Sequence, residues 1–181
     1  MRPAFLFLLL PAGLALLASC AGSHKASGAL PLGFGLRNRY DRHDQPQGRW
    51  RTYYDAERRE PYTTGRYRHG QPVRTFKYYA PTGALDHSEV YGREGFCEVT
   101  YWYPSGKVAR RGRAQWLTGG KGARFYWFGP WTSFAEQGDT TALETYVNGN
   151  QATRIGFENG RRATLETYDK AGRVLTTTKL N

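Results

Sequence analysis

The chain has 181 residues, with 26 lysines and arginines against 15 aspartates and glutamates, which gives a formal net charge of +11. This length predicts one domain of modest size. The charge favours anionic partners: lipid head groups, anionic glycans, acidic proteins or nucleic acid. Only Cys20 and Cys97 could form a disulfide, which excludes a disulfide-rich scaffold. The 15% aromatic residues and 22 glycines are typical of strands and tight turns rather than helices.

Residues 1–19 predict a secretion signal, because a short basic start is followed by an apolar run over residues 4–18. The run is shorter than the roughly 20 residues of a membrane-spanning helix. Its ending, Leu-Ala-Ser-Cys20, resembles the lipobox of bacterial lipoproteins. That resemblance implies that Cys20 receives a diacylglyceryl group and becomes the new N-terminus. A plain signal peptide and a short transmembrane helix are the alternatives.

An anchor at Cys20 predicts a protein held in the cell envelope, outside the cytoplasm. The outer membrane is favoured if the cell has one, because Ala21 is not the Asp that retains some lipoproteins in the inner membrane. We do not expect nucleic acid as a partner there. Residues 20–39 are small, glycine-rich and partly polar, so they predict a flexible tether. Residues 40–181 form the predicted repeat domain of about five units.

Two short elements alternate along this domain. The first is a large apolar residue, two further residues and an aromatic residue, except that the third copy begins with valine. Its copies are residues 50–53, 76–79, 99–102, 131–134 and 165–168. A glycine follows four residues later in all but the first copy, which has Glu57 there: Gly83, Gly106, Gly138 and Gly172. The second element, aromatic-X-X-glycine, occurs at residues 67–70, 116–119, 146–149 and 157–160, with a longer variant at 91–95.

Each unit therefore predicts a strand, a glycine turn, a second strand and a second turn. Asn148-Gly149 and Asn159-Gly160 are strong hairpin signals, because both positions tolerate positive φ. One hairpin cannot bury its own face, so neighbouring units must pair. We expect an all-β protein, with repeated antiparallel hairpins in an elongated, twisted open sheet. Residues three apart in a strand lie on opposite faces, so either both faces carry aromatics or a bulge realigns them.

The recurrence resembles the variant membrane occupation and recognition nexus (MORN) repeat, most closely at residues 78–83, 102–108 and 146–149. The resemblance covers roughly residues 48–174. It implies a hairpin-repeat sheet that contacts proteins or lipids without catalysis. Bacterial chains of this kind are often labelled antitoxins, which implies a cytoplasmic partner. The signal and Cys20 depart from that label, so the antitoxin role is not carried over.

The sequence contains few residues in a pattern typical of catalysis. The four histidines are isolated, and no Cys-X-X-Cys spacing supports a metal or redox site. Residues 118–124 resemble a phosphate loop only faintly, because Gln115 stands in place of the first glycine and Gly122 in place of Ser or Thr. We expect no enzyme, no cofactor and no metal. Cys97 is expected to be a small buried residue, with a reactive thiol as the alternative.

One stretch, residues 107–124, combines several basic residues and a tryptophan with no acidic residue, a pattern that can hold anionic polymers. The candidate residues for an anionic partner are Lys107, Arg110, Arg111, Arg113, Trp116, Lys121 and Arg124. A solvated loop is the alternative interpretation. The leading hypothesis is a non-enzymatic envelope lipoprotein that binds proteins or anionic lipid or glycan. The others are an antitoxin or immunity-type protein and an envelope glycan hydrolase with two carboxylates about 5–9.5 Å apart.

Overall fold

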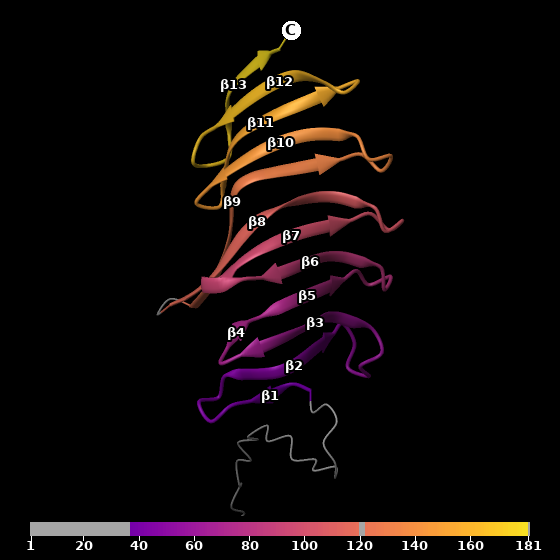
Figure 1. Ribbon diagram of the computed structural model, residues 1–181, viewed down its shortest axis with the longest axis vertical. Coiled ribbons are helices and arrows are strands. Elements are labelled where there is room, and N and C mark those ends of the chain that lie inside the picture. Colours follow the sequence, from indigo (N-terminus) through magenta and orange to yellow (C-terminus); the bar gives the residue numbers. More distant parts are fainter. Residues whose placement is uncertain (1–36, 120–121, 181) are drawn as a thin grey trace, which may run out of the picture. The chain divides into compact units, whose positions relative to one another are not determined.

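The computed structural model describes residues 37–119 and 122–180 (Figure 1). The predicted signal, Cys20, Lys121 and most of the predicted tether lie outside the described residues. The strands are β1 (Arg39–Tyr40), β2 (Pro46–Tyr53), β3 (Pro61–Arg68), β4 (Gln71–Pro72), β5 (Arg74–Tyr79), β6 (Leu85–Tyr91), β7 (Phe96–Trp102), β8 (Val108–Gly119), β9 (Gly122–Phe134), β10 (Thr140–Val147), β11 (Asn150–Glu158), β12 (Arg161–Tyr168) and β13 (Val174–Lys179). A 3₁₀ turn, η1 (Arg93–Gly95), separates β6 from β7.

All 13 strands belong to one open sheet. Each strand pairs antiparallel with the next in chain order, except that β5 pairs with β3, and the short β4 pairs only with β3. The predicted all-β class and the open sheet of antiparallel hairpins are therefore confirmed (Figure 1). No helix in the described part of the chain is long and apolar enough to cross a membrane.

The first repeated element ends in the same turn four times. In each, the glycine N–H donates to the carbonyl three residues earlier, as Gly83 does to Ala80 at 2.8 Å. The same bond joins Gly106 to Tyr103, Gly138 to Ala135 and Gly172 to Asp169. All four glycines have positive φ, between 77° and 105°, which is the reason for glycine there. The predicted Asn-Gly hairpins are also present, with Asn148 at φ 51° and Gly149 at φ 83°.

The first unit lacks this glycine and forms a longer loop instead. Tyr54 N–H donates to the Glu60 carbonyl at 2.9 Å, across the loop. The Asp55 carboxylate accepts the backbone N–H groups of Arg59 and Glu60 at 3.0 and 2.7 Å. Arg58, at φ 61°, takes the place of the glycine, because its N–H donates to the Asp55 carbonyl at 3.3 Å. The Asp55 side chain adds hydrogen bonds that hold the longer loop.

The two faces of the sheet differ. One face carries the aromatic core, in which Phe76, Val99 and Trp131 are almost fully buried. The other face carries the last, aromatic residue of the same motifs. Trp102 there donates to Ser88 Oγ at 3.4 Å, and the ring of Phe134 lies under Arg111. Both faces therefore bear aromatic residues, as one of the two alternatives requires.

β-Bulges occur beside these motifs, but they do not bring the first and last residues of a motif onto the same face of the sheet. A register shift precedes the last aromatic residue in all five copies, between Thr52 and Tyr53, Tyr78 and Tyr79, Tyr101 and Trp102, Ser133 and Phe134, and Thr167 and Tyr168. The largest irregularity lies in β9, where Arg111 pairs with Thr132 but Arg113 pairs with Phe128. The extra residues let the second half of β9 turn toward β10, which it joins through Gly129 to Phe134.

Candidate functional site

The structure divides the predicted basic stretch between the two faces. Arg110 lies on the aromatic face, where its guanidinium stacks over Trp127 at 4.5 Å and Trp131 at 5.0 Å. It also donates to the Glu144 carboxylate and to the Tyr146 hydroxyl. Arg110 is thus already neutralised by a carboxylate of the same chain, and its role there is structural.

The other predicted residues of this stretch lie apart from Arg110. Arg111 and Arg113 are exposed on the opposite face, each 5.4 Å from a phenylalanine ring, Phe134 and Phe128 respectively. Trp116 packs against the aromatic core. Lys107 is exposed in the turn before β8, and Arg124 donates to the Tyr126 hydroxyl at 3.1 Å. These residues do not form one surface, and Lys121 lies outside the described residues.

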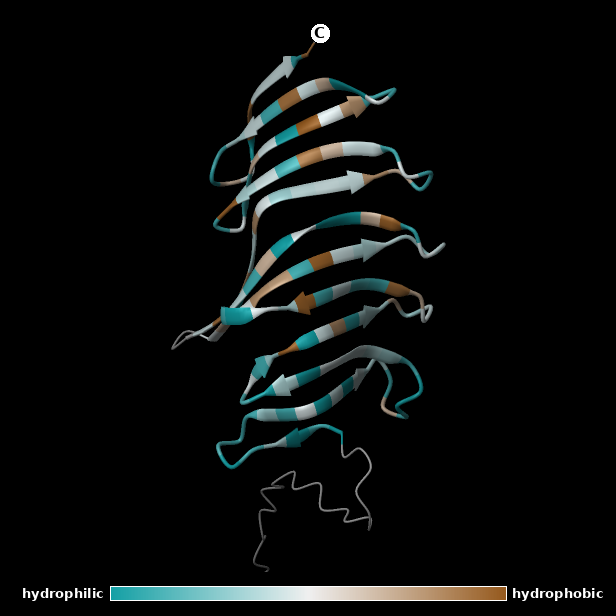
Figure 2. Cartoon of the chain, viewed as in Figure 1, coloured by the Kyte–Doolittle hydropathy of each residue, from teal (hydrophilic) through white to brown (hydrophobic). Residues whose placement is uncertain are grey.

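A denser group of basic side chains lies on the first strands of the sheet. Strands β1 to β5 contain seven basic residues and no acidic residue: Arg39, Arg49, Arg51, Arg66, Arg68, Arg74 and Lys77. We call these seven residues the basic surface. Figure 2 shows the hydrophilic character of β1 and β2 against the apolar segments of β10 to β12. None of the seven makes an ion pair with any described residue.

The strand register brings these side chains together. Arg49 lies directly opposite Arg66, and Arg51 lies opposite Thr64, which in turn lies opposite Lys77. Arg49 and Arg51 are two residues apart and therefore share a face. Like charges directly opposite each other in a sheet are destabilising. An anion between Arg49 and Arg66 would remove this cost, which is the physical reason to look for a ligand here.

The basic surface borders two open hollows. The larger, about 550 Å³, is lined by Arg49, Arg51, Arg66 and Lys77, with the hydroxyl-bearing Thr64 beside them. The smaller, about 340 Å³, shares Arg66 and Arg74 with the first and adds Arg39 and Arg68. Guanidinium, ammonium and hydroxyl groups are all hydrogen-bond donors. The arrangement can therefore hold an anion, and it has no group that could act as a general base.

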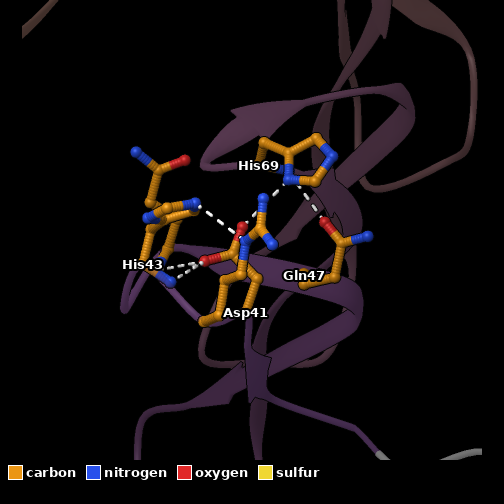
Figure 3. Close-up of polar contacts among 6 residues, drawn as sticks. Asp41, His43, Gln47 and His69 are labelled. Carbon is orange, nitrogen blue, oxygen red and sulfur yellow. Dashed lines mark hydrogen bonds and ion pairs between the residues drawn. The ribbon is translucent and has the colours of Figure 1, made fainter.

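The carboxylates near this surface have other partners. Figure 3 shows Asp41, whose Oδ2 lies 2.9 Å from His69 Nδ1 and whose Oδ1 accepts the His43 N–H at 2.8 Å. The hydrogen bond from His69 is the main cause that lowers the pKa of Asp41 to about 2. Asp55 is engaged by its own loop, and backbone hydrogen bonds from Arg59 and Glu60 lower its pKa. These acids stabilise turns and leave the basic surface unneutralised.

The aromatic face holds one buried carboxylate, Glu89. It accepts the Tyr91 and Tyr78 hydroxyls at 2.7 and 3.0 Å. The imidazole of His87 stacks on Tyr78 with ring centroids 4.1 Å apart. Burial, and next the charge of Glu89, raises the pKa of the Cys97 thiol to about 12. Cys97 is buried, as predicted, and the raised pKa makes it a weak nucleophile.

Glu89 and Glu144 do not form the pair that a glycan hydrolase would use. Glu166 lies on the same face two strands from Glu144, with Arg154 between them. Glu89 on β6 and Glu144 on β10 are separated by three intervening strands, or roughly 19 Å along the sheet at the usual strand spacing. Each is bonded to tyrosine hydroxyls or arginine. The described residues contain no group of three or more His, Cys, Asp or Glu side chains that could hold a metal ion.

The basic surface is hard to recognise in the sequence, because its members are spread over residues 39–77 and alternate with acidic loops. Asp41, Asp44, Asp55, Glu57 and Glu60 make the same window look mixed in charge. The available signal was the spacing of Arg49 with Arg51 and of Arg66 with Arg68 inside two paired strands. Comparison with known proteins adds no assignment, since no protein-family model and no curated protein matches the chain.

Proposed function

We propose that the chain is a non-enzymatic binding module of the cell envelope, anchored through a lipidated Cys20 and built on MORN-like hairpin repeats. Its basic surface holds an anionic partner, either an acidic protein or an anionic lipid or glycan. The observation that carries this proposal is the concentration of seven basic residues, without a carboxylate, on β1 to β5. Arg49 and Arg66 are directly opposed, and neither forms an ion pair with a described residue.

The position of the basic surface in the chain suits an anchored protein. Arg37, at the rim of the larger hollow, follows Cys20 by 37 − 20 = 17 residues. That length of chain reaches at most about 60 Å when extended. The basic surface is therefore the part of the domain with the shortest tether to the membrane. A lipid chain combined with a basic patch anchors a protein more durably than either alone.

Anchoring is tested by changing Cys20 to alanine and fractionating the cells. We expect wild type to remain with the membranes and the variant to appear in the soluble fraction outside the cytoplasm. Wild-type protein that washes off without detergent would contradict the anchor. Retention of the variant in the membrane fraction would also contradict it, unless neutralising the basic surface in addition releases the protein.

Partner binding is tested by capture from detergent-solubilised envelope, with the tagged full chain as bait. The test variant is Arg49→Gln/Arg66→Gln. The control is Arg161→Gln/Arg162→Gln, which removes the same charge from exposed positions on β12. We expect wild type and control to capture the same component and the test variant to lose it. Equal capture by all three proteins would overturn the proposed role of the basic surface.

The antitoxin or immunity-type function is the second candidate, because an acidic protein would complement the basic surface. In the same capture experiment it predicts a protein that co-purifies at a fixed ratio and whose toxic activity is suppressed by the chain. Recovery of lipid or glycan without a protein would exclude it.

A further inference from the structure

The outer edge of β13 is open. All six residues of Val174–Lys179 are exposed, and β13 is hydrogen-bonded to β12 on one side only. No described residue pairs with its other side. The Leu180 N–H donates to the Ala163 carbonyl at 2.8 Å, which sets the alternation of the ladder. Thr176 and Thr178 therefore point their backbone groups toward β12, whereas Thr177 and Lys179 point theirs outward.

This edge has few of the features that usually protect a sheet edge. Proteins protect exposed edges with prolines, inward-pointing charges, bulges in the outer strand or very short strands. β13 has six residues with no proline, and Lys179 at its end is its only charged residue. Its one bulge, at Leu175, lies near the start of the strand and leaves residues 176–179 in regular pairing with β12. The opposite edge is protected, because β1 has only two residues. The unprotected row of outward N–H and C=O groups is suited to pairing with another strand.

We propose that two copies of the chain join through β13, antiparallel and about a two-fold axis at Thr177. A two-fold axis between antiparallel strands passes midway between two identical residues, here the two copies of Thr177. Because the backbone groups of Thr177 point outward, the two copies of this residue form a hydrogen-bonded pair. In this register Thr176 faces the partner's Thr178, and the bulged Leu175 lies next to the partner's Lys179. Threonine thus meets threonine, and no like charges are opposed, which favours a second copy as the occupant.

The charge distribution supports the same pairing. The basic surface lies on β1 to β5, at the other edge of the sheet. Residues 140–180 are nearly balanced, with six basic residues (Arg154, Arg161, Arg162, Lys170, Arg173 and Lys179) and four acidic residues (Glu144, Glu158, Glu166 and Asp169). Joining at β13 therefore keeps the two basic surfaces far apart. A head-to-tail contact would instead use the two-residue β1 and bring one copy's basic surface to the interface.

The proposal is tested by cross-linking Thr177→Cys in the full chain with a short bismaleimide. Residues paired across antiparallel strands have Cα atoms about 5.5 Å apart, within reach of the reagent. Cys97 is buried and does not compete, and both this variant and its control also carry Cys20→Ala so that the Cys20 thiol cannot react. The control is Val90→Cys, a half-exposed position in the middle of the sheet. We expect a covalent dimer from Thr177→Cys only. No dimer from Thr177→Cys, or equal dimer from the control, overturns the proposal.

A second measurement does not depend on a reactive thiol. Thr177→Pro removes an outward N–H without removing a bond to β12, because Thr177 does not donate to that strand. Sedimentation equilibrium of the full chain in detergent should give a dimer for wild type and a monomer for Thr177→Pro, with unchanged far-ultraviolet circular dichroism. A monomeric wild type overturns the proposal, and so does a folded Thr177→Pro variant that still dimerises. Cross-linking of Thr177→Cys to a different protein would show a foreign strand at this edge instead.

Discussion

Gly112 and Trp131 show at the residue scale how a single-layer sheet buries an aromatic ring. The ring of Trp131 lies directly over Gly112, so that a Cβ on this glycine would come within 2.1 Å of a ring carbon. Trp131 is fully buried, and its Nε1 donates to the Arg113 carbonyl at 3.1 Å, which fixes the ring in place. Gly65 and Phe76 repeat the arrangement, with a Cβ distance of 2.3 Å.

The first prediction concerns this contact. Gly112→Ala should lower the free energy of unfolding by about 1–3 kcal/mol, because the ring must shift and lose its packing. Chemical denaturation followed by tryptophan fluorescence measures the change. The control is Leu117→Ala, an exposed substitution on the same strand, which should stay within about 0.5 kcal/mol. A Gly112→Ala protein as stable as this control would show that the ring is not held over the glycine.

The second prediction concerns Cys97. Because burial and Glu89 raise the pKa of its thiol to about 12, only about one thiol in ten thousand is ionised at pH 8. We expect no labelling of Cys97 by maleimide in the folded protein at pH 8 and rapid labelling in guanidinium chloride. Mass spectrometry of the labelled peptide gives the result. Fast labelling of the folded protein would revive the reactive-thiol alternative.

At the scale of elements, the paired strands β2 and β3 carry arginines that destabilise the sheet and belong to the proposed binding surface. Arg49 and Arg66 are directly opposed and lack an acidic partner among the described residues. The third prediction is that Arg49→Gln raises the free energy of unfolding by about 0.2–1 kcal/mol at low salt, because it removes a like-charge pair. The same substitution should weaken capture of the anionic partner. A lower melting temperature for Arg49→Gln than for wild type would contradict the interpretation that Arg49 and Arg66 repel each other.

The β1–β2 turn provides the fourth prediction, which is a dependence on pH. The pKa of Asp41 is lowered in the folded protein from 3.8 to about 2, so its stabilising effect is complete above about pH 4 and is lost as the pH falls toward 2. The amides of His43 and Gln45, which donate to Asp41 Oδ1, should lose hydrogen-exchange protection over that interval.

Two variants of this turn distinguish protonation of the Asp41 carboxylate from other effects of low pH on amide protection. Asp41→Asn should have low amide protection at pH 6 and no further loss between pH 4 and 2. Asp44→Asn removes the same charge from the same turn, but no hydrogen bond to its carboxylate occurs among the described residues, so it should behave as wild type. Loss of protection in Asp41→Asn that follows the wild-type pH profile would contradict the role of Asp41.

The elements that could be predicted are those with a local cause. The glycines at 83, 106, 138 and 172 form one kind of turn because each turn needs a positive φ, and sequence shows such positions directly. The two extra residues of β9, between its pairing with Arg111 and its pairing with Arg113, could not be predicted. They depend on how β9 pairs with β8 on one side and β10 on the other. The basic surface was missed for a similar reason, since its residues meet only through the register of separate hairpins.

For the whole described sheet, the chain order of the strands places different properties in different regions. The aromatic core lies on one face around β5 to β10, and the basic surface lies on β1 to β5 toward the edge formed by β1. The other edge, formed by β13, is nearly neutral and open. A sheet of this kind leaves the basic surface and the edge of β13 exposed, which suits contact with large partners better than enclosure of a small substrate.

The central claim is that the basic surface, rather than net charge, binds the anionic partner. It is tested most directly by the affinity of the full chain for fluorescein-labelled poly-glutamate, measured by anisotropy at several salt concentrations. We predict that Arg49→Gln/Arg66→Gln weakens binding at least tenfold more than Arg161→Gln/Arg162→Gln and makes it less dependent on salt, because fewer ionic contacts form. Equal losses in the two double variants would contradict the claim, because only the total charge would then matter.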